Sequence, residues 1–198
     1  KTIGLDPRIG KLFLNAGPGY GGSCLPKDMK ALINFAKASG INPTLLNAVE
    51  EVNTKQLEQI ILMIKQKLGN LASKKITILG TAFKPNTDDI RDSIAIELIK
   101  KLLNKKAKII IHDPKAMKNT QRIFKEKINY AKTIEDALAK SQCVIIMTQW
   151  KQYEKLNNNQ FKYMTRKFVI DCRRMLAKKQ LDVDYYAIGL GKQNWNIL

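Results

Sequence analysis

Histidine and cysteine are scarce in this sequence, and that scarcity excludes several kinds of site. His112 is the single histidine among 198 residues, and three cysteines stand far apart at positions 24, 143 and 172. The spacings show no CxxC pair or other metal-ligand pattern, so a zinc site is not expected. A cysteine hydrolase would have only His112 as its base. We expect free thiols in a reducing, cytoplasmic compartment.

Long apolar runs are also lacking. No stretch approaches the roughly 20 apolar residues that a membrane-spanning helix needs, and residues 1–6 lack the apolar region of a signal peptide. No membrane partner is therefore expected. The first residue is Lys1 and not Met, which is the pattern of a chain that begins inside a longer protein.

Negative charge is in short supply. The chain has 35 Lys and Arg against 17 Asp and Glu, for a net charge of +18. Such a charge suits nucleic acid, an acidic membrane surface or an anionic small substrate. The lysines are spread over almost every segment and are not gathered with aromatic residues, so a solvated lysine-rich surface is the simpler interpretation. A nucleic-acid-binding module stays open as an alternative.

Two helices are predicted in the first third of the chain. The first runs from Pro26 to Ser39. The second runs from Pro43 to Leu68, with apolar residues at three- and four-residue spacing and Gly69 as its stop. Its length of roughly 38 Å needs a surface to lie on, either a neighbouring domain or a second copy of itself. Residues 1–72 are expected to form this helical segment.

From residue 74 onward, short β-branched runs alternate with helix-like stretches. This alternation predicts an α/β fold, with a Rossmann-like parallel sheet covered on both faces over residues 73–198. Ligands then belong at the carboxyl ends of the strands. The predicted helices are 93–103 and 133–140, the second with Thr133 and Asp136 placed as in a capping box, and residues 157–160 are predicted as a loop. The predicted strands are 76–79, 108–111, 128–130, 144–147, 168–170 and 185–188.

The densest chemical pattern is GPGYGGSCLPKD at residues 17–28. Glycines let the backbone fold tightly against a bound group, and a thiol at a helix N-terminus lies in a positive potential that favours its thiolate. Cys24 is therefore a candidate nucleophile. The competing interpretation is a cysteine that only packs as a small apolar residue.

A second candidate site follows the first predicted strand. Its loop, GTAFKPN, lacks the GxGxxG pattern, so a nicotinamide cofactor is not expected to bind there in that mode. Phe83, Lys84 and Arg91 suit the stacking of a ring and the pairing of a phosphate, and a solvated charged loop is the alternative. Arg173 follows a later strand, where a cation could meet a phosphate.

Two motifs, FLNAGPGYGGSCLPKD at 13–28 and GTAFKPNTDDIRD at 80–92, resemble the UDP-glucose 6-dehydrogenase family. The resemblance continues through DCRR at 171–174. It implies an NAD-dependent, two-step oxidation of UDP-glucose to UDP-glucuronate, with a thiohemiacetal and then a thioester on Cys24, and with Asp28 as the acid that handles water. Dehydrogenases of GDP-mannose or UDP-N-acetylmannosamine share the GG-x-C core and stay open, as does a noncatalytic UDP-sugar-binding module.

The resemblance assigns further roles. It implies that Cys24 and Arg91 contact the cofactor, and that helix 43–68 connects two domains and forms the core of a homodimer. Nothing in this sequence matches the family's N-terminal NAD-binding domain, so these residues alone are expected to show no turnover and at most weak UDP-sugar binding. The residues implied to hold UDP-glucose are Arg8, Phe13, Leu14, Asn15, Gly17, Tyr20, Gly21, Phe83, Lys84 and Arg173, with at least one of the two arginines coming from a partner subunit.

Overall fold

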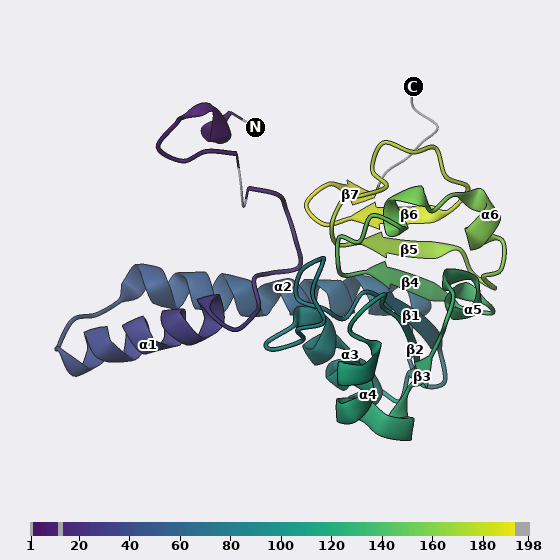
Figure 1. Cartoon of the computed structure of the whole chain (residues 1–198), viewed down its shortest axis with the longest axis horizontal. Helices are drawn as coiled ribbons and strands as arrows, with labels where there is room; N and C mark the ends of the chain where they lie inside the picture. The colour runs from purple at the N-terminus through teal and green to yellow at the C-terminus, as the bar shows by residue number, and fades with distance from the viewer. Residues whose placement is uncertain (1, 12–13, 193–198) are drawn as a thin grey trace.

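A computed structural model describes residues 2–11 and 14–192 of the chain. The N-terminal segment contains one short 3-10 helix, η1 (Ile3–Leu5), and Figure 1 shows this segment standing apart from the sheet. Helices α1 (Leu25–Ala38) and α2 (Thr44–Leu68) follow and lie side by side as a hairpin that projects from the rest of the molecule.

Both predicted N-terminal helices are confirmed to within two residues at each end. Pro26 stands in the first turn of α1, where its missing N–H costs no hydrogen bond. At the end of α2, the N–H of Gly69 donates to the carbonyl oxygen of Lys65 over 2.8 Å. Within the described ranges, no helix is both long and apolar enough to cross a membrane.

The second part of the chain is a seven-stranded sheet in the order β3-β2-β1-β4-β5-β6-β7. The first six strands pair in parallel, and only β7 runs antiparallel, against β6. All six predicted strands are therefore confirmed, whereas β7 was not predicted. The strands are β1 (Lys75–Leu79), β2 (Lys108–His112), β3 (Asn129–Tyr130), β4 (Cys143–Ile146), β5 (Phe168–Asp171), β6 (Asp184–Ala187) and β7 (Gly191–Lys192).

The crossover segments form short helices, and one prediction about them is wrong. The loop expected at residues 157–160 is instead the start of a helix, because the side chain of Asn157 accepts the N–H of Asn159 and Gln160 Oε1 accepts the N–H of Asn157. An asparagine run resembles a loop, yet asparagine is also a strong N-cap residue. The helices are α3 (Ile94–Asn104), α4 (Met117–Phe124), α5 (Ile134–Leu138) and α6 (Asn158–Phe161), with 3-10 turns η2 (Lys125–Lys127) and η3 (Tyr153–Lys155).

The core lies on both faces of the sheet. On one face, strand residues such as Ile78 and Ile145 pack with α3 and the second half of α2. On the other face, residues such as Leu79 and Val144 pack with α5, η3 and α6. Cys143 and Cys172 are fully buried in the first of these layers, as expected for packing thiols.

Helix α2 has two different halves. Ile60 and Ile64 are fully buried in the same core as the sheet, whereas Leu45 and Val52 in the first half are 75% and 57% exposed. The second half of α2 therefore lies on the sheet of its own chain, and only the first half projects. A domain boundary at residue 72 remains a prediction.

We expect Ile64→Ala to lower the free energy of unfolding by about 3 kcal/mol, because it leaves a cavity between α2 and the sheet. Leu62→Ala, on the exposed side of the same helix, should cost less than about 1 kcal/mol. Urea denaturation of the two variants measures the difference. Equal losses would contradict the packing of α2 on the sheet.

Candidate functional site

A pocket lies at the carboxyl edge of the sheet, where four segments of the chain meet. The glycine loop forms one wall, the loop after β1 and the start of α3 form another, and the residues after β4 and β5 close it. The lining residues are Pro18, Gly19, Gly21, Ala82, Phe83, Ser93, Ile94, Ala95, Met147 and Arg173.

The glycine loop lies directly against the segment that precedes α3. The N–H of Gly22 donates to the carbonyl oxygen of Arg91 over 3.1 Å. A Cβ on Gly21 would lie 2.2 Å from the carbonyl oxygen of Asp92, and one on Gly22 would lie 2.6 Å from the ring of Phe83. Only glycine allows these two loops to meet so closely, which explains the glycine pair.

Arg173 supplies the cationic group of the pocket. Its Nε donates to the carbonyl oxygen of Met147 over 2.8 Å, and its Nη1 faces Gly17, where a Cβ would come within 2.6 Å. Among the described residues, no carboxylate lies within ion-pair distance of this guanidinium. Burial lowers the pKa of Arg173, but an arginine stays charged in proteins. The pocket therefore holds a half-buried positive charge suited to an anion.

Helix α3 starts at the same pocket. Ser93 is its N-cap residue, and Ile94 and Ala95 form its first turn. The free N–H groups of a first turn carry partial positive charge and favour a phosphate or carboxylate. The Ser93 hydroxyl donates to the carbonyl oxygen of Thr81 over 2.7 Å and so ties the helix start to the loop after β1.

Two buried aspartates hold the loops of the pocket. Asp171, at the end of β5, accepts the N–H groups of Arg173 and Leu176 and the hydroxyl of Tyr185, at 2.8 to 2.9 Å. Burial raises the pKa of Asp171, and these hydrogen bonds oppose that shift. The carboxylate thus fixes the turn that carries Arg173.

Asp113 has the corresponding place after β2. Its carboxylate accepts the N–H groups of Thr81 and Ala82, at 2.7 and 3.1 Å, and the indole N–H of Trp150 at 3.2 Å. The N–H groups of Lys115 and Ala116 complete the set. The first N–H groups of the loop after β1 are therefore already bonded to a carboxylate of the same chain. A dinucleotide pyrophosphate would need those donors, so this loop does not fit NAD in the Rossmann mode.

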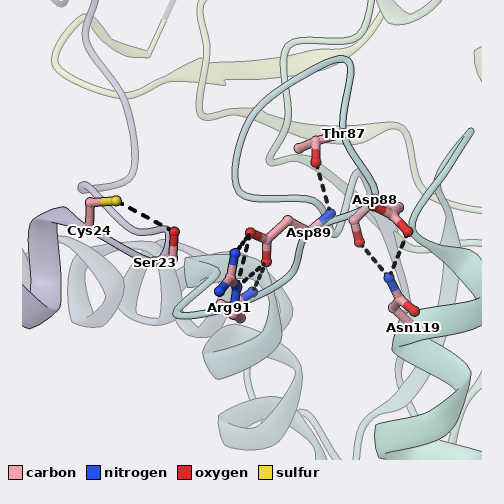
Figure 2. A network of polar contacts seen from close by, with 7 residues as sticks. All are labelled: Ser23, Cys24, Thr87, Asp88, Asp89, Arg91 and Asn119. Carbon is pink, nitrogen blue, oxygen red and sulfur yellow. Dashed lines mark hydrogen bonds and ion pairs between the residues drawn. The ribbon is translucent and has the colours of Figure 1, made fainter.

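Cys24 is exposed and occupies the N-cap position of α1. Figure 2 shows it beside Ser23, whose Oγ lies 3.6 Å from Sγ, and across from the loop that carries Arg91. The Arg91 guanidinium is paired with Asp89 over 2.7 Å. The hydrogen bonds and charge of Asp89 raise the pKa of Arg91.

Asp28 and Arg8 lie outside the pocket lining. Asp28 is in the first turn of α1, where its N–H donates to the carbonyl oxygen of Cys24 and its carboxylate pairs with Lys27 over 3.3 Å. Arg8 is exposed in the N-terminal segment and forms two bonds to Asp6, at 3.0 and 2.7 Å.

The other predicted substrate contacts divide into three groups. Gly21, Phe83 and Arg173 line the pocket, Gly17 lies against the Arg173 guanidinium, and Tyr20 joins two of the lining glycines. Lys84 is exposed, with its Nζ 5.4 Å from the centre of the Phe83 ring, and Leu14 and Asn15 are exposed outside the lining. Phe13 lies outside the described residues.

His112 is not placed to act as a base. It is buried, and its Nδ1 lies 2.9 Å from the hydroxyl of Tyr153, which donates to the carbonyl oxygen of His112. Burial lowers the pKa of His112, so the ring is neutral. The structure thus gives Cys24 no histidine partner, which argues against a Cys–His hydrolase.

Family models cover both walls of the pocket. The model of the central domain of the UDP-glucose/GDP-mannose dehydrogenase family matches residues 1–55, and the model of the UDP binding domain of the same family matches residues 77–178. The chain belongs to the UDP-glucose/GDP-mannose dehydrogenase family. Cys24 lies in the first matched segment and Arg173 in the second.

Individual members of this family agree with the assignment. The chain is 41% identical over 188 residues to UDP-glucose 6-dehydrogenase AglM of Haloferax volcanii, covering 95% of this chain and 43% of that protein. It matches a UDP-glucose dehydrogenase structure from Pyrobaculum islandicum with a TM-score of 0.84 and 35% identity, over 93% of this chain and 41% of the other. The chain therefore spans less than half the length of these relatives.

A more distant structure shares the fold alone. The structure of a UDP-D-ManNAc dehydrogenase from Pyrococcus horikoshii superposes with a TM-score of 0.76 at 22% identity, covering 95% of this chain and 43% of that one. The same overall fold is thus found at a much lower sequence identity.

Sequence reasoning missed the residues that hold this family member's pocket in shape. Ser93 entered only as the first residue of a predicted helix, Asp171 only as part of the DCRR motif, and Asp113 was not singled out. A usable signal existed, because Asp113 and Asp171 both stand at carboxyl ends of strands. Asn53, which contacts the glycine loop from α2, gave no comparable signal.

We expect iodoacetamide to modify Cys24 alone in the folded chain. Cys143 and Cys172 are fully buried, and burial raises the pKa of both thiols. Intact-mass analysis should show one adduct under native conditions and three in denaturant, with Cys24→Ser giving no native adduct. Two or more native adducts at full folding would contradict the burial of the strand thiols.

Proposed function

We propose that the pocket binds the nucleotide part of UDP-glucose and that Cys24 is the nucleophile of a cytoplasmic UDP-glucose 6-dehydrogenase. The observation that carries the proposal is the guanidinium of Arg173, which has no carboxylate partner among the described residues and faces a glycine-lined pocket at the start of α3. Guanidinium groups and helix N-termini are both suited to phosphate. A diphosphate could bind the guanidinium of Arg173 and the N-terminus of α3 at the same time.

In this proposal, the chemistry takes place on Cys24. Its Sγ attacks the C6 aldehyde of the sugar and gives a thiohemiacetal. Loss of the C6 hydride to the bound oxidant and of the hydroxyl proton to solvent would convert this adduct into a thioester, and water then hydrolyses the thioester to the carboxylate and the free thiol. Asp28, one helical turn along α1, accepts the proton of that water. The exposed position of Cys24 suits a thiol that must meet a sugar, a hydride acceptor and water in turn.

NAD, when bound, accepts one hydride in each of the two oxidations. The loop after β1 does not fit the dinucleotide, because Asp113 occupies its amide donors. Among the described residues, Arg91 and Cys24 are the proposed cofactor contacts. The guanidinium of Arg91 is exposed and paired with Asp89. Because it is exposed, a phosphate bound beside the thiol could also reach it.

UDP-glucose is favoured over the alternatives by the comparisons. Relatives above 30% identity, such as those from Haloferax volcanii and Rickettsia felis, carry the name UDP-glucose 6-dehydrogenase, whereas the UDP-D-ManNAc dehydrogenase from Pyrococcus horikoshii, at 22%, shares the fold alone. A nucleic-acid-binding module is less well supported, because the basic residues are spread along the sequence and, of those that the structure describes, only Arg173 lines the pocket.

We also propose a homodimer through the helix hairpin. Phe35 on α1 and Leu45 on α2 are 71% and 75% exposed, and Ile41 between the helices is 63% exposed. The first half of α2 is the part available for a second copy, because the second half is buried on the sheet. Covering these side chains would remove apolar surface from water.

We expect Arg173→Gln to weaken UDP-glucose binding at least tenfold, because it removes the charge facing the pocket. Isothermal titration of the chain with UDP-glucose, GDP-mannose and UDP-N-acetylmannosamine measures both this loss and the choice of nucleotide sugar. Arg122→Gln, an exposed cation on α4, is the matched control and should bind as the unmodified chain does.

Three results would count against the proposal. Equal affinities of Arg173→Gln and the unmodified chain for UDP-glucose would show that the guanidinium takes no part in binding. Tighter binding of GDP-mannose would move the chain to another branch of the family. Nucleic-acid binding by this chain that UDP cannot displace, with an affinity that falls steeply as salt rises, would favour the nucleic-acid alternative.

Light scattering tests the proposed dimer. We expect the unmodified chain to show twice its 22.5 kDa mass and Leu45→Glu to shift toward the monomer, because a buried unpaired charge is costly. Leu190→Glu, at an exposed leucine between β6 and β7, is the control and should leave the mass unchanged. A dimer that persists in Leu45→Glu would rule out this part of the hairpin as its contact.

A further inference from the structure

The side chain of Asn53 is bonded to both backbone polar groups of one residue in the glycine loop. Its Oδ1 accepts the N–H of Tyr20 over 2.8 Å, and its Nδ2 donates to the carbonyl oxygen of Tyr20 over 3.2 Å. The two residues are 33 positions apart in the sequence. A primary amide is the side-chain group that offers one donor and one acceptor in this spacing.

The loop is shaped to receive this amide. Gly19 has a φ of +118°, and a Cβ there would lie 2.6 Å from Oδ1 of Asn53. One turn earlier on α2, Glu50 accepts the hydroxyl of Tyr20 over 2.7 Å, and burial together with this bond raises the pKa of Tyr20 to about 12. Helix α2 therefore forms hydrogen bonds with Tyr20 both at its backbone and at its hydroxyl.

A second contact fixes the other end of the loop. Gly22 donates to the carbonyl oxygen of Arg91, on the segment that leads into α3. Gly21 lies between these two contacts and Gly19 stands directly before them; both glycines line the pocket, and Cys24 follows Gly22 by two residues. The loop is thus held from α2 on one side and from the sheet domain on the other.

We propose that Asn53 is a positioning residue, which sets the shape of the glycine loop and thereby the wall of the pocket and the place of Cys24. It does not line the pocket, so it acts through the loop and not by touching a ligand. This inference rests on the proposed function, since it takes the pocket to be the UDP-sugar site. The helix itself gives no reason for an asparagine, a weak helix former, at this interior position.

Three variants of the chain separate the role of the amide from that of the helix. Asn53→Ala removes both bonds to Tyr20. Asn53→Asp keeps the acceptor for the Tyr20 N–H and loses the donor. Thr54→Ala is the matched control, because the exposed Thr54 hydroxyl bonds only to the Glu50 carbonyl oxygen of the same helix. Amide hydrogen exchange, read by mass spectrometry over residues 17–24 and 57–68, reports loop and helix separately.

We expect Asn53→Ala to raise exchange in residues 17–24 at least tenfold and to leave residues 57–68 unchanged. The dissociation constant for UDP-glucose should rise about tenfold, since two hydrogen bonds hold the bound shape of the loop. Asn53→Asp should fall between Asn53→Ala and the unmodified chain in both measurements, and Thr54→Ala should match the unmodified chain. A merely structural role would raise exchange in both regions together.

The outcomes distinguish this inference from the function on which it rests. Loop exchange in Asn53→Ala equal to that in Thr54→Ala overturns the inference, as does faster exchange with unchanged UDP-glucose affinity. Absence of UDP-glucose binding by the unmodified chain overturns the proposed function, and the exchange data then decide alone whether Asn53 holds the loop. If Asn53→Ala does not fold, Asn53→Asp gives the same comparison with one bond removed.

Discussion

The apolar packing of α2 on the sheet is the contact on which the site depends. Ile60 and Ile64 are buried in the core that also contains the strands. This packing fixes the position of α2, and with it the hairpin, relative to the sheet. The glycine loop is bonded to the middle of that helix, and Arg173 belongs to the sheet. The buried half of α2 thus helps to hold the thiol segment beside the residues that follow β4 and β5.

Above that contact, the pocket is built mainly from backbone. Loops at the carboxyl edge of a parallel sheet leave amide and carbonyl groups that must be satisfied. Asp113 and Asp171 accept several of these amides at once, and in doing so they fix the two loops that carry Phe83 and Arg173. Because each buried carboxylate has several donors, its desolvation is offset by hydrogen bonds. Arg173 has no carboxylate partner among the described residues, and it is the cation that lines the pocket.

The sequence was sufficient for the fold because the fold follows from local patterns. Buried parallel strands are continuous apolar runs, and α1 and α2 have proline near their starts and glycine after their ends. The loop motifs were also readable, and Gly17, Gly21, Phe83 and Arg173 do meet. Asn53 and Asp113 could not be found in this way. Their side chains form hydrogen bonds with backbone groups more than 30 positions away, and such contacts produce no periodic pattern in the sequence. The helix at residues 157–160 was missed because a capping asparagine and a loop asparagine look the same.

The two ends of the sheet are formed by its shortest strands. β3 and β7 have two residues each, so either edge exposes few unpaired backbone groups. A long, flat edge would be a template on which another chain could add a strand and start aggregation. This sheet gives such growth almost no starting point, and a lysine-rich surface adds repulsion between molecules. The molecule can thus carry exposed apolar side chains on its helix hairpin while its strands stay inert toward neighbouring copies.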